Sequence, residues 1–113
     1  QEIIRERGAS NNNRFVNNHA RLHYHDKDSV ITNSIYQNNY WAGAASDMGF
    51  FETTLSNNNI YQGNITAPKL SGAGNYGLTI IGKQSKVLSH SFTDGRTFIT
   101  NINGTNVPFL NPN

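Results

Sequence analysis

The sequence predicts an all-β protein, and its composition carries that prediction. The chain has 113 residues, of which 18 are Asn and 10 are Gly. Asn and Gly are poor helix formers but suit turns and left-handed backbone positions. The apolar residues lean towards Ile, Val, Phe and Tyr, which favour strands. Since 14% of the residues are charged, the polar surface is built mostly from amides and hydroxyls, and the length fits one domain with one core.

Charge, cysteine content and hydropathy narrow the possible partners. The formal net charge is +2, and basic residues gather only at Arg5, Arg7 and Arg14, so we expect no nucleic-acid partner. The absence of Cys excludes disulfides and thiolate metal sites. No apolar run approaches the roughly 20 residues that span a bilayer, so we expect no membrane partner. The start at Gln1, without an initiator Met or a signal peptide, predicts a piece of a longer protein.

Short strands and polar turns can be assigned in order along the chain. Residues 3–7 predict a strand that ends before Gly8, and residues 20–25 predict a half-buried strand that alternates between two faces. The other expected extended segments are residues 29–32, 50–55, 65–70, 76–82, 86–92 and 96–102. Between them we expect turns at residues 26–28, 72–74 and 94–95, a loop at residues 40–49 and a capping tail at residues 103–113.

An amide-rich stretch occurs three times and gives the chain a period. Two close copies are Asn33-Ser34-Ile35-Tyr36-Gln37-Asn38-Asn39 and Asn57-Asn58-Asn59-Ile60-Tyr61-Gln62-Gly63-Asn64, which are 25 positions apart. A weaker copy, Asn12-Asn13-Arg14-Phe15-Val16-Asn17-Asn18, lies another 21 positions upstream. Loop residues inserted between Trp41 and Gly49 account for the difference between the two intervals.

A β structure with this period predicts coils stacked along an axis rather than hairpins. Equivalent residues of successive coils then lie about 4.8 Å apart, the spacing of strands in a sheet. We therefore expect the Asn side chains to form a ladder in which each amide bonds to the next, with Asn in the left-handed conformation at the turns. We also expect Ile35 and Ile60 to point into the core.

These amide-rich copies resemble the coils of right-handed parallel β-helix proteins of the pectate-lyase type. That group includes polysaccharide lyases and hydrolases and the trimeric tailspikes of bacteriophages. The resemblance is good over residues 11–66 and weak elsewhere. It implies about five coils, with residues 1–70 as amide-ladder coils and residues 71–113 as terminal coils and a capping tail of the same domain. The alternative fold is an antiparallel β-sandwich of ordinary hairpins.

The strand at residues 20–25 carries the densest group of polar side chains. Its alternation places Leu22 and Tyr24 on one face and the polar side chains on the other. The candidate ligand-binding residues on that face and in the following turn are Arg21, His23, His25 and Asp26. They predict either a sugar or carboxylate site, in which His acts as acid or base, or a solvated outer face. The two His need a further ligand to hold a metal ion, so we expect no metal site and no cofactor.

Two further groups of side chains point to carbohydrate chemistry. Trp41 and Tyr40 stand beside a glycine-rich loop, where a flat ring either stacks on a sugar or fills the core or a contact between subunits. Asp47 and Glu52 are the candidate catalytic pair, because glycoside hydrolysis needs two carboxylates.

The resemblance implies a structural and host-glycan-recognition part of a trimeric bacteriophage tailspike or fibre. Its partner would be a bacterial surface polysaccharide, its assembly a homotrimer, and its location the virion tail or the extracellular medium. One alternative is a fragment of a secreted polysaccharide lyase or glycoside hydrolase. The other is a small lectin-like carbohydrate-binding module.

Overall fold

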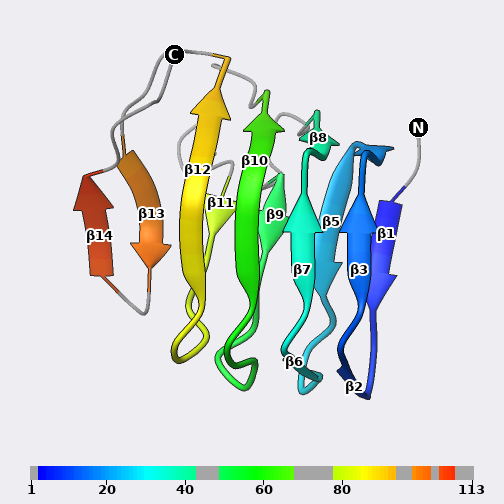
Figure 1. The fold of residues 1–113 in the computed structure, drawn as a ribbon. Helices are drawn as coiled ribbons and strands as arrows, with labels where there is room; N and C mark the ends of the chain where they lie inside the picture. The colour runs from blue at the N-terminus through cyan, green and yellow to red at the C-terminus, as the bar shows by residue number, and fades with distance from the viewer. Residues whose placement is uncertain (1–2, 43–48, 68–77, 94–97, 103–104, 109–113) are drawn as a thin grey trace.

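The computed structural model describes residues 3–42, 49–67, 78–93, 98–102 and 105–108 (Figure 1). Within these ranges every regular element is a β-strand, so the predicted all-β class is confirmed. The strands are β1 (Ile3–Glu6), β2 (Ala9–Asn11), β3 (Arg14–Val16), β4 (His19–Ala20), β5 (Leu22–His25), β6 (Val30–Thr32), β7 (Ile35–Gln37), β8 (Tyr40–Trp41), β9 (Phe50–Phe51), β10 (Ile60–Thr66), β11 (Leu78–Thr79), β12 (Lys86–Phe92), β13 (Phe98–Ile102) and β14 (Thr105–Pro108). No helix of the described residues is long and apolar enough to cross a membrane.

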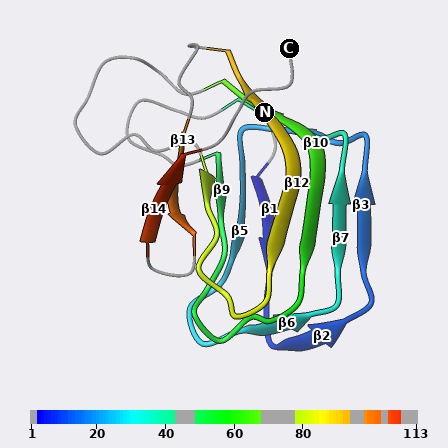
Figure 2. The same cartoon turned by 60° about the vertical axis from the view of Figure 1, so that its left-hand side comes forward.

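Strands β1–β12 fall into four successive repeats, made of β1–β4, β5–β8, β9–β10 and β11–β12. Equivalent strands of neighbouring repeats pair side by side and in parallel. The first sheet has the order β1-β5-β9-β11-β13-β14, and the second sheet has the order β3-β7-β10-β8-β4, with β12 also paired to β10. A short sheet of β2 and β6 lies across one end, between the two larger sheets (Figure 2). Among the described strands only β13 and β14 pair antiparallel, so the expected alternative of an antiparallel sandwich is wrong.

The register of the second sheet reproduces the period seen in the sequence. Ile35 pairs with Arg14, 21 residues earlier, and Ile60 pairs with Ile35, 25 residues earlier. In the first sheet His23 pairs with Phe50, 27 residues later. One residue separates β4 from β5, whereas eight separate β8 from β9. The extra residues therefore lie where the sequence predicted an insertion.

The Asn residues at the turns adopt the left-handed conformation, as predicted. Positive φ angles of 53° to 60° occur at Asn12, Asn17, Asn33, Asn38 and Asn58. Gly63, with φ of 69°, follows β10 residue Gln62, which pairs with Gln37, and so occupies the place of Asn38 in the third repeat. Asn and Gly tolerate this region better than other residues do, which explains why the turns of the first three repeats use them, whereas Gln84, with φ of 60°, stands at the equivalent place in the fourth repeat.

The predicted amide ladder is present, but most of its bonds join a backbone N–H to a side-chain oxygen. Asn64 Oδ1 accepts the backbone N–H of Asn39 at 2.8 Å, and Asn39 Oδ1 accepts that of Asn18 at 2.9 Å. Amide-to-amide bonds also occur, from Asn39 Nδ2 to Asn64 Oδ1 at 3.0 Å and from Asn58 Nδ2 to Asn33 Oδ1 at 2.7 Å. The ladder thus satisfies backbone donors at the turns as well as the amides themselves.

The core lies between the two large sheets and is built around aromatic rings. Tyr36 and Tyr61 are fully buried and stack with ring centroids 4.6 Å apart. Ile35 and Ile60, expected in the core, are half-buried on the outer face. The prediction for these two residues is wrong because successive strand residues face opposite sides, and Tyr36 and Tyr61 face the core, where their hydroxyls donate to Glu6 and Glu52.

The C-terminal part of the chain contains the expected strands. The predicted segments at 76–82, 86–92 and 96–102 correspond to β11, β12 and β13. The final hairpin of β13 and β14 ends the first sheet. The expected turns at residues 72–74 and 94–95 lie outside the described residues.

Candidate functional site

Strand β5 alternates as the sequence predicted, but its polar face points inward. His23 is fully buried and His25 is 1% exposed, whereas Leu22 and Tyr24 are only half-buried. The expectation that both His lie on an outer face is therefore wrong. The physical reason is Glu6 on the neighbouring strand β1, which provides a buried carboxylate partner that sequence periodicity alone does not reveal.

The carboxylate of Glu6 gathers three donors inside the core. Its Oε2 lies 2.9 Å from His23 Nε2, 3.2 Å from His25 Nε2 and 2.6 Å from the hydroxyl of Tyr36, which donates to it. Burial raises the pKa of Glu6, but hydrogen bonds from these three groups outweigh burial and lower the pKa to about 2. Burial is also the main cause that lowers the pKa of His23. At neutral pH the carboxylate is therefore ionised and His23 is neutral.

His25 extends this polar network towards the outer face of the first sheet. Its Nδ1 lies 2.9 Å from Ser56 Oγ, which in turn lies 2.9 Å from Thr53 Oγ1. The Nε2 of His25 also lies 2.9 Å from the Tyr36 hydroxyl oxygen. Because that hydroxyl donates its proton to Glu6, the hydrogen bond between His25 and Tyr36 is donated by His25 Nε2. The network satisfies polar groups that would otherwise be costly to bury.

Glu52, one of the two candidate catalytic carboxylates, is a structural residue. It is fully buried and accepts hydrogen bonds from the Tyr61 hydroxyl at 2.7 Å, Ser85 Oγ at 2.8 Å, Asn59 Nδ2 at 2.9 Å and the Gly82 N–H at 2.6 Å. Its oxygens are thus committed to holding the third repeat against the fourth. The other candidate, Asp47, lies outside the described residues.

The two aromatic candidates occupy different sites. Trp41 is fully buried and packs on Phe50, with ring centroids 4.7 Å apart, so it fills the core instead of stacking on a ligand. Tyr40 is half-buried on the outer face of the second sheet, where it meets the ring of His19 edge-on at 4.8 Å.

The remaining polar candidates lie at a groove on the outer face of the first sheet. Arg21 and Asp26 line this groove and are half-buried. Arg5 donates to Asp26 Oδ2 at 2.8 Å, and Arg7 Nε lies 3.5 Å from the same oxygen. The hydrogen bond from Arg5 is the main cause that lowers the pKa of Asp26. Asp26 therefore serves as an anionic anchor for two guanidinium groups.

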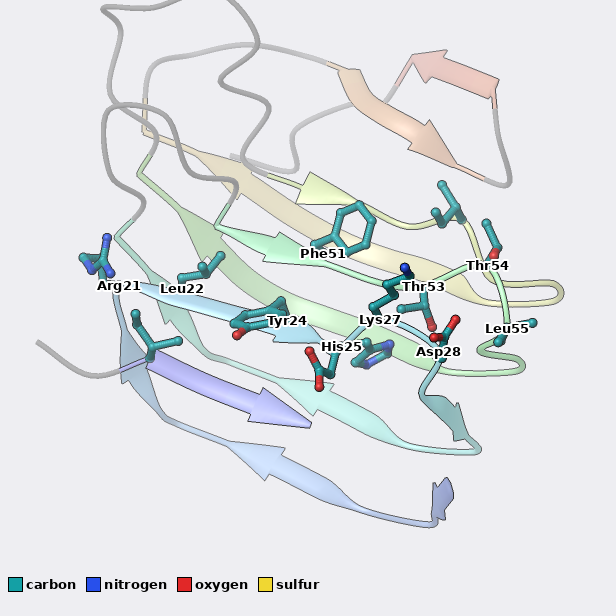
Figure 3. Close-up of a pocket in the computed structure, with 13 residues that line it drawn as sticks. Arg21, Leu22, Tyr24, His25, Lys27, Asp28, Phe51, Thr53, Thr54 and Leu55 are labelled. Carbon is teal, nitrogen blue, oxygen red and sulfur yellow. The ribbon is translucent and has the colours of Figure 1, made fainter. Parts of the chain in front are cut away.

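The groove encloses about 840 Å³ and has an apolar floor with a polar rim. Tyr24 on β5 pairs with Phe51 on β9, and both side chains lie on the groove side of the sheet, as does Leu22 (Figure 3). The apolar lining residues are Ile3, Leu22, Tyr24, Phe51, Leu55 and Ile81. The polar lining residues are Arg21, His25, Asp26, Lys27, Asp28, Thr53 and Thr54.

The groove thus unites Arg21, His25 and Asp26 of the predicted set but leaves Trp41 and Tyr40 elsewhere. Sequence reasoning missed its aromatic floor because Tyr24 was assigned to the inner face. One signal was available in the Phe50-Phe51 pair, since adjacent strand residues face opposite sides and one of the two rings must point outward.

Among the described residues, no group of three or more His, Asp and Glu side chains is arranged to hold a metal ion. Comparison of the chain with protein-family models, with curated proteins and with solved structures finds no match.

Proposed function

We propose that the chain is a glycan-recognition part of a right-handed parallel β-helix protein, and that the groove over the first sheet is its glycan site. The helical architecture is supported by parallel pairing of β1, β5, β9 and β11, of β2 and β6, and of β3, β7, β10 and β12. Each repeat thereby contributes to the same successive sheets. Right-handed winding follows from the strong preference for right-handed connections between parallel strands.

The observation that carries the glycan proposal is the half-buried aromatic pair on the groove floor. Tyr24 and Phe51 lie in register on neighbouring strands and are half-buried, so their rings form a platform for the C–H face of a sugar ring. The hydroxyl of Thr54 and the charged groups of Lys27 and Asp28, all exposed, stand at the rim. A concave apolar surface with a few polar groups is the usual chemistry of a small-ligand site.

We propose recognition in preference to cleavage because Glu52 is buried in the core, where its carboxylate oxygens accept four hydrogen bonds. Within the groove the described carboxylates are Asp26 and Asp28, and Asp26 is paired with Arg5. The partner we propose is a bacterial surface polysaccharide. The chain would bind it as part of a virion tail or as an extracellular protein.

A homotrimer is the assembly we propose. Its support is the outer face of the second sheet, where large apolar side chains remain exposed. Val16 and Ile65 are each 37% exposed and Leu88 is 56% exposed, while Ile35 and Ile60 beside them are half-buried. Exposed apolar surface of this kind marks contacts between chains, and light scattering measures the mass of the assembly directly.

Binding to a panel of bacterial surface polysaccharides tests the glycan proposal. We expect Tyr24→Ala or Phe51→Ala to weaken binding of the recognised glycan about tenfold, which corresponds to about 1.4 kcal/mol. Tyr40→Ala is the matched control, because Tyr40 is a half-buried aromatic residue that does not line the groove. Circular dichroism establishes that each variant is folded.

The proposal fails if no polysaccharide of the panel binds the folded chain. It also fails if Tyr40→Ala weakens binding as much as the two groove variants do, because the groove would then not be the site.

A further inference from the structure

The first repeat has an open edge in the described part of the chain. Strands β1, β2, β3 and β4 each pair with one neighbour only, namely β5, β6, β7 and β8. On β3 the carbonyl of Asn13 accepts from Ile35 and the N–H of Asn17 donates to Gln37. Alternate residues of a parallel strand face the same neighbour, so the N–H and C=O groups of Arg14 and Val16 face away from β7.

Two side-chain ladders end at this same edge. In one, the oxygens of Asn64 and Asn39 accept the backbone N–H of Asn39 and Asn18, at 2.8 and 2.9 Å. Each amide thus receives a donor from the repeat that precedes it. Asn18 occupies the next position, and its side chain has no hydrogen-bond partner among the described residues.

The second ladder runs five residues earlier in each turn. Asn59 donates its backbone N–H to Ser85 Oγ at 3.2 Å, Ser34 donates to Asn59 Oδ1 at 2.9 Å, and Asn13 donates to Ser34 Oγ at 3.3 Å. The next acceptor is Asn13 Oδ1, because Asn13 Nδ2 already bonds Ser10 Oγ. The edge therefore presents two amide oxygens, on Asn13 and Asn18, ready for backbone donors five residues apart.

The apolar core is also left incomplete at this edge. The stacked column of rings begins at Phe15, which is only partly buried. The centroid of its ring lies 5.4 Å from that of Tyr36.

We propose that this edge binds an extended polypeptide segment by parallel β-strand addition. The segment would supply two backbone N–H groups five residues apart to Asn13 and Asn18, and an apolar side chain between them to cover Phe15. This interface continues the one that the repeats already make with each other, which is why a polypeptide with the chemistry of the repeat fits it. Strand addition at a free sheet edge is an established mode of peptide recognition.

A synthetic peptide that copies residues 30–42 is the probe, because it contains β6, β7 and β8. It is titrated into the isotope-labelled full chain and followed by NMR. We expect shifts at the backbone amides of Arg14 and Val16 and at the side-chain amides of Asn13 and Asn18. Asn18→Ala should weaken peptide binding about fivefold, the value of one hydrogen bond of about 1 kcal/mol. Its unfolding should be unchanged, because that side chain makes no internal hydrogen bond.

Gln62→Ala is the matched control, because Gln62 is exposed on the outer face of β10, away from this edge, and should bind the peptide as the natural chain does. Shifts at β12 instead of β3 would overturn the proposal, as would no binding at millimolar peptide or an affinity that Asn18→Ala leaves unchanged. If light scattering shows self-association that Asn18→Ala abolishes, the occupant is a second copy of the chain, and the proposal of a separate segment is wrong.

Discussion

Replacing Asn39 by Ala should be among the most damaging single changes in the second sheet. Asn39 is 1% exposed. Its Oδ1 accepts from the Asn18 N–H at 2.9 Å, and its Nδ2 donates to the Phe15 carbonyl at 2.9 Å and to Asn64 Oδ1 at 3.0 Å. A net value of about 1 kcal/mol for each of these three hydrogen bonds predicts a loss of about 3 kcal/mol in the free energy of unfolding.

Urea denaturation followed by the fluorescence of Trp41 measures this loss, because Trp41 is the single Trp of the chain and is fully buried. Asn18→Ala is the control from the same ladder and should change stability by less than about 0.5 kcal/mol, the usual range for surface substitutions. If Asn39→Ala costs no more than Asn18→Ala, the ladder does not stabilise the stack and the reasoning is refuted.

Two further predictions concern the turns and the buried titratable groups. Asn17 is exposed with φ of 60°, so Asn17→Gly should be near neutral and Asn17→Ala should cost about 1 kcal/mol; equal losses in urea denaturation would contradict the backbone argument. Burial lowers the pKa of His90 from 6.5 to about 3, so its stabilising effect is complete above pH 6.5 and is lost as the pH falls towards 3. Glu6, with a pKa lowered from 4.5 to about 2, stabilises the fold above pH 4.5 and adds a second loss below it. Stability measured from pH 7 to pH 4.5 should therefore fall, and His90→Gln should reduce the slope by about 1.4 kcal/mol per pH unit; an unchanged slope would show that His90 is not buried neutral.

Much of the second sheet follows from local chemistry and could be predicted. The Asn-rich copies mark turns because Asn tolerates positive φ, and their spacing equals the spacing of paired residues such as Ile35 and Ile60. The period was visible in the sequence because successive turns need a residue that tolerates a positive φ angle at the same place. This requirement is local and does not depend on the sequence of the neighbouring strands.

The orientation of side chains was harder to predict because it depends on partners from distant strands. His23 turns inward to meet Glu6 from β1, 17 residues away, and Tyr61 turns inward to meet Glu52. Hydropathy alone predicts that Ile35 and Ile60 are buried and that His23 is exposed. The buried carboxylates of Glu6 and Glu52 reverse this, because they bind His23 and the Tyr side chains in the core. The groove was missed for the same reason, since the inward turn of His23 and His25 is what leaves Tyr24 on the surface.

The unequal connections between repeats have a consequence for how the chain could vary. One residue joins β4 to β5, eight join β8 to β9 and eleven separate β10 from β11, yet the strands on both sides keep their parallel register. Since the entropy of closing a loop grows only slowly with its length, this corner can accept inserted sequence while the turns from β2 to β3 and from β6 to β7 keep two residues each. It is therefore the natural place to graft a foreign peptide onto the scaffold.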